Sequence, residues 1–316
     1  MLVLAPMQGL TGLPFRRAFH RTFGDVFDYA VSPFISLTHG NLTLADKKIS
    51  DVLPENNVGC MPVVPQVLGS EIQEFVDLAN RLYDIGYTEV NWNLGCPMPR
   101  VARKVRGSGL LPYPERVGEV LEALTAKTKI GISVKMRLGY RSENEIFDLI
   151  PVLNGFPLVN VTIHPRIGTE HYSGGLHLDC LGKALPLLRQ KVIFNGDIKT
   201  MSDLREIQTQ FPEIQDFMIG RGAIADPLLP LKIKKGSAEE GKELILSFLK
   251  NLFEEIDALR IPGKSKANKL KEYWGMMREG FAKDFSDTEK PLYISPFGEV
   301  LDTILDIVER QMDKII

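Results

Sequence analysis

ISVKMRL (residues 132–138) and VNVTIH (159–164) are the two stretches of sequence that decide the fold class. Apolar and polar side chains alternate in both, and this period of two is that of a β-strand whose faces meet different surroundings. The apolar face suits a layer of helices, and the polar face, with Lys135 and His164, then points into a barrel or toward its mouth. The apolar set is Ile132, Val134, Met136 and Leu138 in the first stretch and Val159, Val161 and Ile163 in the second.

Further short β-like runs lie on both sides of this pair, and helix-like segments separate most of them. Eight strand candidates occupy residues 2–6, 27–32, 62–67, 88–93, 131–137, 158–164, 191–195 and 216–219. Eight strands that alternate with helices over about 235 residues have the rhythm of a (β/α)8 TIM barrel. A doubly wound sheet is the competing α/β arrangement, but no GxGxxG follows the first strand. The sequence therefore predicts a TIM barrel.

Helix-start signals support the alternation. Ser70 with Gln73 and Ser142 with Glu145 have the spacing of capping boxes, and each pair precedes an amphipathic run. Pro114 opens a third helical segment, since proline is well placed in a first helical turn.

After residue 236 only helical periodicity remains. Apolar residues recur at three- and four-residue steps within 245–259, 270–281 and 297–308. This pattern is typical of a small helical bundle. We expect two domains: residues 1–236 for the barrel and 237–316 for the bundle.

The composition is that of an ordinary globular protein, with 44% hydrophobic and 25% charged residues and a net charge of -2. Cys60, Cys96 and Cys180 are widely spaced without a CxxC pair, which argues against a disulfide framework and a structural zinc site. The apolar start, MLVLAPM, is too short for a signal peptide or a membrane span. We expect a cytoplasmic monomer with no membrane or metal partner.

Polar residues and glycines gather where the predicted strands end. In a TIM barrel these ends form the active-site face, so the sequence predicts a pocket there. The residues are Met7 and Gln8, Ser32, Gln66, Asn93 to Cys96, Lys135 and Arg137, His164 and Arg166, Asn195 to Asp197, and Gly220 to Gly222. The glycines of FNGDI (194–198) and MIGRGA (218–223) follow the last two strands, the usual phosphate site of this fold.

Lys135 admits three interpretations from the residues alone. It is a Schiff-base nucleophile, as in an aldolase, a fixed cation beside an anionic cofactor ring, or the partner of a neighbouring carboxylate. Few carboxylates lie at the strand ends, which argues against a metal site of that type. His164, in the company of Lys135 and Gln66, is best read as a hydrogen-bond donor to a ligand.

The segment NWNLGCPMPRVARKVRGSGLL (91–111) places Cys96 at the mouth of a predicted strand, between Gly95 and Pro97 and ahead of several cations. A buried structural thiol requires none of these neighbours, so we interpret Cys96 as a residue that takes part in the chemistry.

Taken in order, these motifs resemble the tRNA-dihydrouridine synthases. They are APMQGLTGLPFRR (5–17), PQVLGS (65–70), NLGCP (93–97), VKMRLG (134–139), IHPR (163–166), NGDI (195–198) and IGRGA (219–223). The resemblance implies an FMN-dependent enzyme that reduces a uridine of tRNA to dihydrouridine with NADPH. The length and short N-terminus favour the C-type subfamily, which acts on a D-loop uridine near position 16.

The same resemblance implies roles for individual residues. Cys96 would donate a proton to the uracil after hydride transfer from flavin N5, and Asn93 would help to hold that base. The residues implied in FMN binding are Pro6, Met7, Gln66, Lys135, His164, Asn195, Asp197, Gly220 and Arg221.

Cations point to a partner that is a polyanion. Arg100, Arg103 and Lys104 follow the cysteine, and seven cations against two glutamates lie between residues 260 and 283. Three cations of that second group lie approximately at the positions where family members contact tRNA: Lys269, Lys271 and Arg278.

Two further alternatives remain open from the sequence. A dihydroorotate dehydrogenase-like FMN barrel would act on a free pyrimidine and would not need the basic helical tail. A non-catalytic RNA-binding protein would keep the barrel without the flavin.

Overall fold

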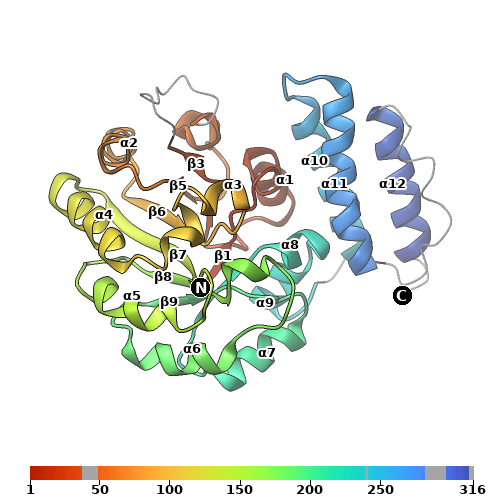
Figure 1. Cartoon of the computed structure of the whole chain (residues 1–316). Helices are drawn as coiled ribbons and strands as arrows, with labels where there is room; N and C mark the ends of the chain where they lie inside the picture. Colours follow the sequence, from red (N-terminus) through yellow and green to blue (C-terminus); the bar gives the residue numbers. More distant parts are fainter. Residues whose placement is uncertain (38–48, 239–240, 282–296, 313–316) are drawn as a thin grey trace.

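The computed structural model describes residues 1–37, 49–238, 241–281 and 297–312 (Figure 1). Within these residues, ten short strands form one parallel sheet. They are β1 (Leu2–Leu4), β2 (Tyr29–Val31), β3 (Ile35–Ser36), β4 (Val63–Val64), β5 (Gln66–Leu68), β6 (Glu89–Leu94), β7 (Gly131–Gly139), β8 (Val161–Ile167), β9 (Val192–Phe194) and β10 (Asp216–Ile219).

The sheet closes on itself through β4 and β5, which are two parts of one strand interrupted at Pro65. β4 pairs with β2, whereas β5 pairs with β6. Proline lacks an N–H and so breaks the ladder, although the Pro65 carbonyl still accepts the N–H of Asn91 at 2.8 Å. Since β1 pairs with both β2 and β10, the strands form a ring of eight positions, and the predicted TIM barrel is confirmed.

All eight predicted strands are present, with three differences in detail. The run 62–67 is divided at Pro65, and β3 was not predicted because two residues carry no periodicity. The placement of Val159 against the helix layer was wrong, because β8 begins only at Val161 and Val159 is 46% exposed in the preceding loop.

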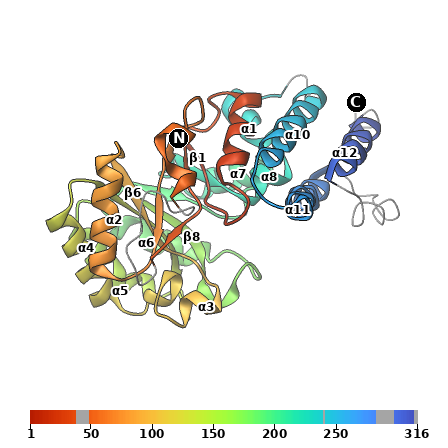
Figure 2. The same cartoon turned by 90° about the horizontal axis from the view of Figure 1, so that it is seen from above.

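Helices surround the barrel, as Figures 1 and 2 show from two directions. They are α1 (Leu13–Phe23), α2 (Ile72–Asp84), α3 (Pro99–Ala102), α4 (Pro114–Lys127), α5 (Glu145–Asn154), α6 (Leu178–Ala184), α7 (Met201–Gln210), α8 (Arg221–Ala225) and α9 (Leu229–Lys235). The apolar side chains of the strands that face outward join those of the helices in one continuous core.

The barrel interior is divided into an apolar and a polar half. Val3, Val31, Ile193 and Met218 form a small separate cluster from β1, β2, β9 and β10. Strands β5 to β8 instead turn polar side chains inward, and these residues lie at the base of the candidate site. They are Gln66, Asn91, Asn93, Ser133, Lys135, Thr162 and His164.

The C-terminal part of the described chain is helical, as predicted, and consists of α10 (Gly241–Asp257), α11 (Gly263–Phe281) and α12 (Phe297–Met312). In both views these helices lie to one side of the barrel, with α10 along α1 and α11 near α8 (Figures 1 and 2). Phe248 of α10 and Tyr273 of α11 contact the ring of Phe15 in α1, with centroids 5.6 and 5.9 Å apart. The two parts therefore share a hydrophobic core, and their division into two domains stays a prediction.

Candidate active site

A cavity of about 490 Å³ opens at the carboxyl ends of the strands. Residues from the ends of β1, β6, β7, β8, β9 and β10 line it, and Met276 of α11 completes its wall. Of the residues predicted to bind a cofactor or to react, nine lie on this wall together with Asn93: Pro6, Met7, Cys96, Lys135, His164, Asn195, Asp197, Gly220 and Arg221.

Gln66 is the exception among the predicted cofactor residues. Its side chain is fully buried and is not among those that line the cavity. Its amide nitrogen donates to Asn91 Oδ1 and its amide oxygen accepts from Asn93 Nδ2, both at 2.8 Å. In this arrangement Gln66 lies beneath Asn93 and fixes its orientation, and contact with a flavin stays a prediction.

Asn93 determines the direction of Cys96. Its side-chain oxygen accepts the N–H of Gly95 at 3.1 Å and of Cys96 at 2.9 Å. Asparagine commonly forms turns of this kind, in which its side-chain oxygen accepts backbone N–H groups two or three residues further along the chain. The Cys96 carbonyl in turn accepts both the N–H and the hydroxyl of Ser108, at 3.1 and 3.0 Å. Hydrogen bonds to both the N–H and the carbonyl of Cys96 therefore fix its backbone and the direction of its thiol.

The thiol of Cys96 stays protonated at neutral pH. Burial raises its pKa, and the nearby cations Arg100, Arg137 and Lys135 offset this only in part. A cysteine that is protonated and open to a cavity suits proton donation, whereas a redox or nucleophilic cysteine requires the thiolate.

Positive charge dominates the wall of the cavity. Five cationic side chains face one carboxylate, that of Asp197; they are Arg100, Lys135, Arg137, Lys199 and Arg221. Burial, with Arg137 adding to it, lowers the pKa of Lys135 to about 7. Burial, followed by the charges of four surrounding cations, holds the pKa of His164 well below its usual value, so this ring is neutral. Such a site favours an anionic ligand.

Asp197 is held between two arginines, Arg166 near the end of β8 and Arg221 at the start of α8. Both Nη atoms of Arg166 reach its carboxylate, as does Arg221 Nη2. Although burial opposes ionisation, the hydrogen bond and charge of Arg166, with the charge of Arg221, keep the pKa of Asp197 below its usual value. The φ of Asp197 is +39°, a left-handed conformation that costs energy in a residue other than glycine.

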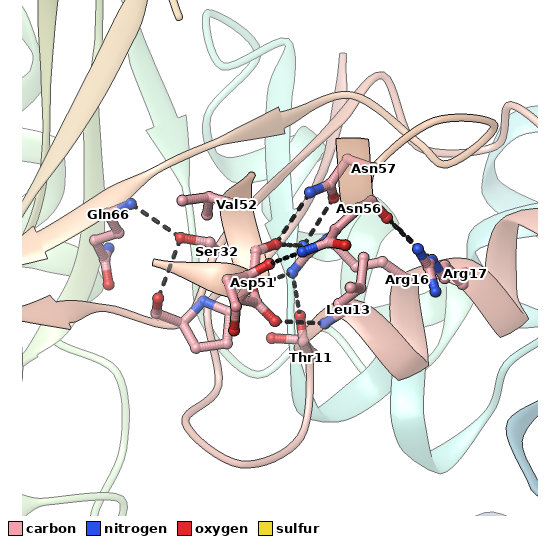
Figure 3. A network of polar contacts seen from close by, with 12 residues as sticks. Thr11, Leu13, Arg16, Arg17, Ser32, Asp51, Val52, Asn56, Asn57 and Gln66 are labelled. Carbon is pink, nitrogen blue, oxygen red and sulfur yellow. Dashed lines mark hydrogen bonds and ion pairs between the residues drawn. The ribbon is translucent and has the colours of Figure 1, made fainter. Parts of the chain in front are cut away.

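The sequence motif at residues 5–17 shapes the β1–α1 loop (residues 5–12). Thr11 Oγ1 accepts the N–H of Met7 at 2.7 Å and donates to the Ala5 carbonyl at 2.8 Å, which closes the loop on itself. Arg16 is fully buried and reaches back from α1 to Asp51 and Asn57 (Figure 3). Thr11 and Arg16 therefore support the cavity wall without lining it.

Tyr172 is a cavity residue that the sequence did not single out. The guanidinium carbons of Arg137 and Arg221 lie 5.3 and 4.9 Å from its ring centroid, and the ring of His164 lies 6.5 Å away. These partners come from β7, β8 and the start of α8, so only the folded barrel brings them to this loop residue.

The cations predicted to bind RNA occupy three kinds of position. Arg100 lines the cavity, and Arg103 and Lys104 are exposed beside it. Lys271 and Arg278 lie on α11. Lys269 is half-buried and donates a hydrogen bond to the carbonyl of Gly9 in the β1–α1 loop.

Within the described ranges, no group of three or more His, Cys, Asp or Glu side chains has the arrangement of a metal site. In the same residues, no helix has the length and apolar character needed to cross a membrane.

Comparison with solved structures supports the fold. An old yellow enzyme from Trypanosoma cruzi superposes with a TM-score of 0.52 at 7% identity, covering 75% of this chain and 88% of that one. A morphinone reductase mutant in complex with tetrahydroNAD gives 0.51 at 11% identity, with coverages of 75% and 87%. At these identities the likeness shows the barrel fold alone.

Sequence relatives are more specific. The tRNA-dihydrouridine(16) synthase of Neisseria meningitidis serogroup B is 26% identical, covering 99% of this chain and 96% of that protein. A probable tRNA-dihydrouridine synthase of Staphylococcus epidermidis is 28% identical, with coverages of 81% and 78%. The family model described as dihydrouridine synthase (Dus) matches residues 3–274. Because this match spans most of the sequence, the chain belongs to the dihydrouridine synthase family of oxidoreductases.

Proposed function

We propose that this protein reduces a D-loop uridine of tRNA to 5,6-dihydrouridine, with FMN as cofactor and NADPH as the source of electrons. One observation carries the proposal: Cys96, held as a thiol, opens into a cavity whose wall has five cationic side chains and one carboxylate. Family membership supports the same reaction.

The residues present fit FMN. Among the described residues, no ion pair joins Lys135 to a carboxylate, so its charge is available to an anionic ring. Asn195, Asp197, Gly220 and Arg221 would hold the ribityl phosphate, with Arg221 as the phosphate partner. Pro6 and Met7 would lie along the ring, and His164 would donate to it. When bound and reduced, FMN supplies a hydride for C6 of the uracil.

Cys96 completes the addition across the uracil double bond. As C6 gains the hydride, the Sγ–H bond breaks and its proton goes to C5, which leaves a thiolate that solvent reprotonates. The raised pKa of Cys96 serves both steps, because the residue rests as a thiol and recovers its proton readily. Asn93, which points Cys96 into the cavity, would also contact the base.

A uridine inside folded tRNA must leave its stack to reach this thiol. Arg100, Arg103 and Lys104 at the rim, and Lys271 and Arg278 on α11, are suited to phosphates on either side of the extruded base. The Neisseria meningitidis relative is named for position 16, and we propose that position here. A tRNA substrate also implies the cytoplasm, and we propose a monomer.

The alternatives are less well supported. Residues 3–274 match the dihydrouridine synthase family beyond the barrel and through most of α11, whereas a reductase of free pyrimidines has no need of α11. Neither a Lys135 aldolase nor a non-catalytic RNA-binding protein explains a protonated Cys96 in the same cavity.

The decisive experiment maps dihydrouridine in tRNA by mass spectrometry in a strain that lacks this gene. We expect loss of the modification at position 16 and its return when the gene is restored. An unchanged pattern, with no second synthase in the strain, would refute the proposal. Loss at another D-loop position would correct the site and leave the reaction standing.

A further inference from the structure

Helix α11 reaches the active site at three points along one face. The hydroxyl of Tyr273 donates to the carbonyl of Leu10, and Lys269 Nζ donates to the carbonyl of Gly9. Met276 lies one turn further along and lines the cavity. The helix therefore touches both the β1–α1 loop and the space that the loop encloses.

Gly9 and Leu10 precede α1, and no backbone N–H of that helix donates to their carbonyls. Pro14 lacks the N–H that could reach Leu10, and the N–H of Leu13 donates to Asp51 Oδ1 at 2.6 Å. A buried carbonyl without a partner is costly, so the hydroxyl of Tyr273 satisfies a group that α1 leaves open.

Tyr273 is well suited to this role. It is 1% exposed and its ring stacks near Phe15, so the hydroxyl has little freedom to move away. Burial raises its pKa above the usual value for tyrosine, so it remains a donor at all ordinary pH values. Lys269 lies closer to the surface and adds a second donor one turn earlier.

The loop that these residues hold is a wall of the cavity. Pro6, Met7, Gln8 and Leu10 all line it. Thr11 closes the loop from within, and Arg16 supports it from the side of Asp51 (Figure 3). Helix α11 holds the loop through the carbonyls of Gly9 and Leu10, to which the side chains of Thr11 and Arg16 donate no hydrogen bond.

We propose that Lys269 and Tyr273 are positioning residues, which hold the β1–α1 loop in the shape that receives the cofactor. The helical part of the chain is then a component of the catalytic site as well as a surface for RNA. Lys269 thereby has a role different from the tRNA contact expected from the sequence. The proposal rests on the proposed function only where it concerns FMN.

Hydrogen exchange of the protein without flavin tests the loop directly. The amides of Leu10 and Thr11 both donate to the Met7 carbonyl and should be protected. We expect Tyr273→Phe to raise their exchange about tenfold, the factor that corresponds to one buried hydrogen bond. Lys269→Met should raise it less, and Lys269→Arg should restore it. Tyr83→Phe and Lys127→Met, on the distant helices α2 and α4, are the matched controls.

Binding measurements separate the roles of two neighbouring lysines. Lys269→Met should weaken FMN binding and leave tRNA affinity nearly unchanged, whereas Lys271→Met should do the opposite. Tyr273→Phe should raise the Kd for FMN about tenfold. Unchanged loop exchange in both Tyr273→Phe and Lys269→Met would overturn the proposal, as would equal loosening of the whole of α10 and α11. Faster loop exchange with no FMN binding in any variant would refute the proposed cofactor and leave the positioning role intact.

Discussion

Cys96 is the residue on which the proposed chemistry depends most. We expect Cys96→Ala to keep FMN binding and to lower the rate of tRNA reduction at least about 100-fold, the usual contribution of a general acid. The measurement is the oxidation of reduced flavin by tRNA in a single turnover. Cys96→Ser keeps a weak proton donor, so its rate should lie between those of the unchanged protein and Cys96→Ala. A near-normal rate in Cys96→Ala would remove the thiol from the mechanism.

The lowered pKa of Lys135 leads us to expect that cofactor affinity depends on pH. Its pKa is about 7 in the free protein, and an anionic ligand would raise it. Above pH 7 the lysine must therefore gain a proton when FMN binds, so affinity should fall by up to about tenfold per pH unit until the pKa of the complex is reached. The Kd between pH 7 and 9 measures this, a range in which a phosphate monoester (second pKa about 6) keeps its charge. Lys135→Met should bind more weakly and without this dependence.

For single residues, the sequence was a good guide to which side chains line the cavity. It was a poorer guide to the partner that each side chain contacts. Nine of the residues that strand ends and motifs assigned to FMN or to catalysis line the cavity, together with Asn93. The same motifs gave no sign that Thr11 and Arg16 build the loop, or that Gln66 lies beneath Asn93. Tyr172 was missed because its partners come from three separate elements, β7, β8 and α8. Contacts of this kind depend on closure of the barrel, which no local pattern describes.

At the scale of elements, the period of two was a sound guide to strands and the capping patterns were a weaker guide to helix starts. The expected cap at Ser70 was wrong, because α2 begins after Glu71. At α5 the cap residue is Asn144, and Glu145 nevertheless accepts the N–H of Ser142 as a capping box requires. Side chains near a helix start have several acceptable partners, and tertiary contacts choose among them.

Two glycines at different places give opposite predictions for the same substitution. A Cβ on Gly222 in α8 would lie 2.1 Å from the Ile198 carbonyl, so Gly222→Ala must move α8 away from the loop that follows β9. Gly275 in α11 has open space around it, and Gly275→Ala should stabilise the protein by about 0.5–1 kcal/mol through helix propensity. Thermal unfolding of both variants is the measurement, and we expect Gly222→Ala also to weaken FMN binding. Equal effects on stability would contradict this account of Gly222.

For the whole molecule, the shared core predicts that the barrel and the helices α10 and α11 unfold together. The sequence has two tryptophans, Trp92 in β6 and Trp274 in α11, and both are buried. Trp92→Phe and Trp274→Phe leave one reporter in each part, and their fluorescence transitions in urea should coincide. An earlier transition at Trp274 would show that the helical part is an independent domain, as the sequence periodicity suggested.

The aromatic face of α1 has a consequence for folding during synthesis on the ribosome. Phe15, Phe19 and Phe23 are covered by Phe248, yet 217 residues separate the end of α1 from the start of α10. At ribosomal rates of about 5–20 residues per second, the nascent barrel waits roughly 10 to 45 s for that cover. During this interval three phenylalanine rings are available to chaperones or to other nascent chains. Synthesis that pauses before residue 241 should therefore yield aggregates, because α10 is made after the whole barrel and covers rings that α1 exposed at its start.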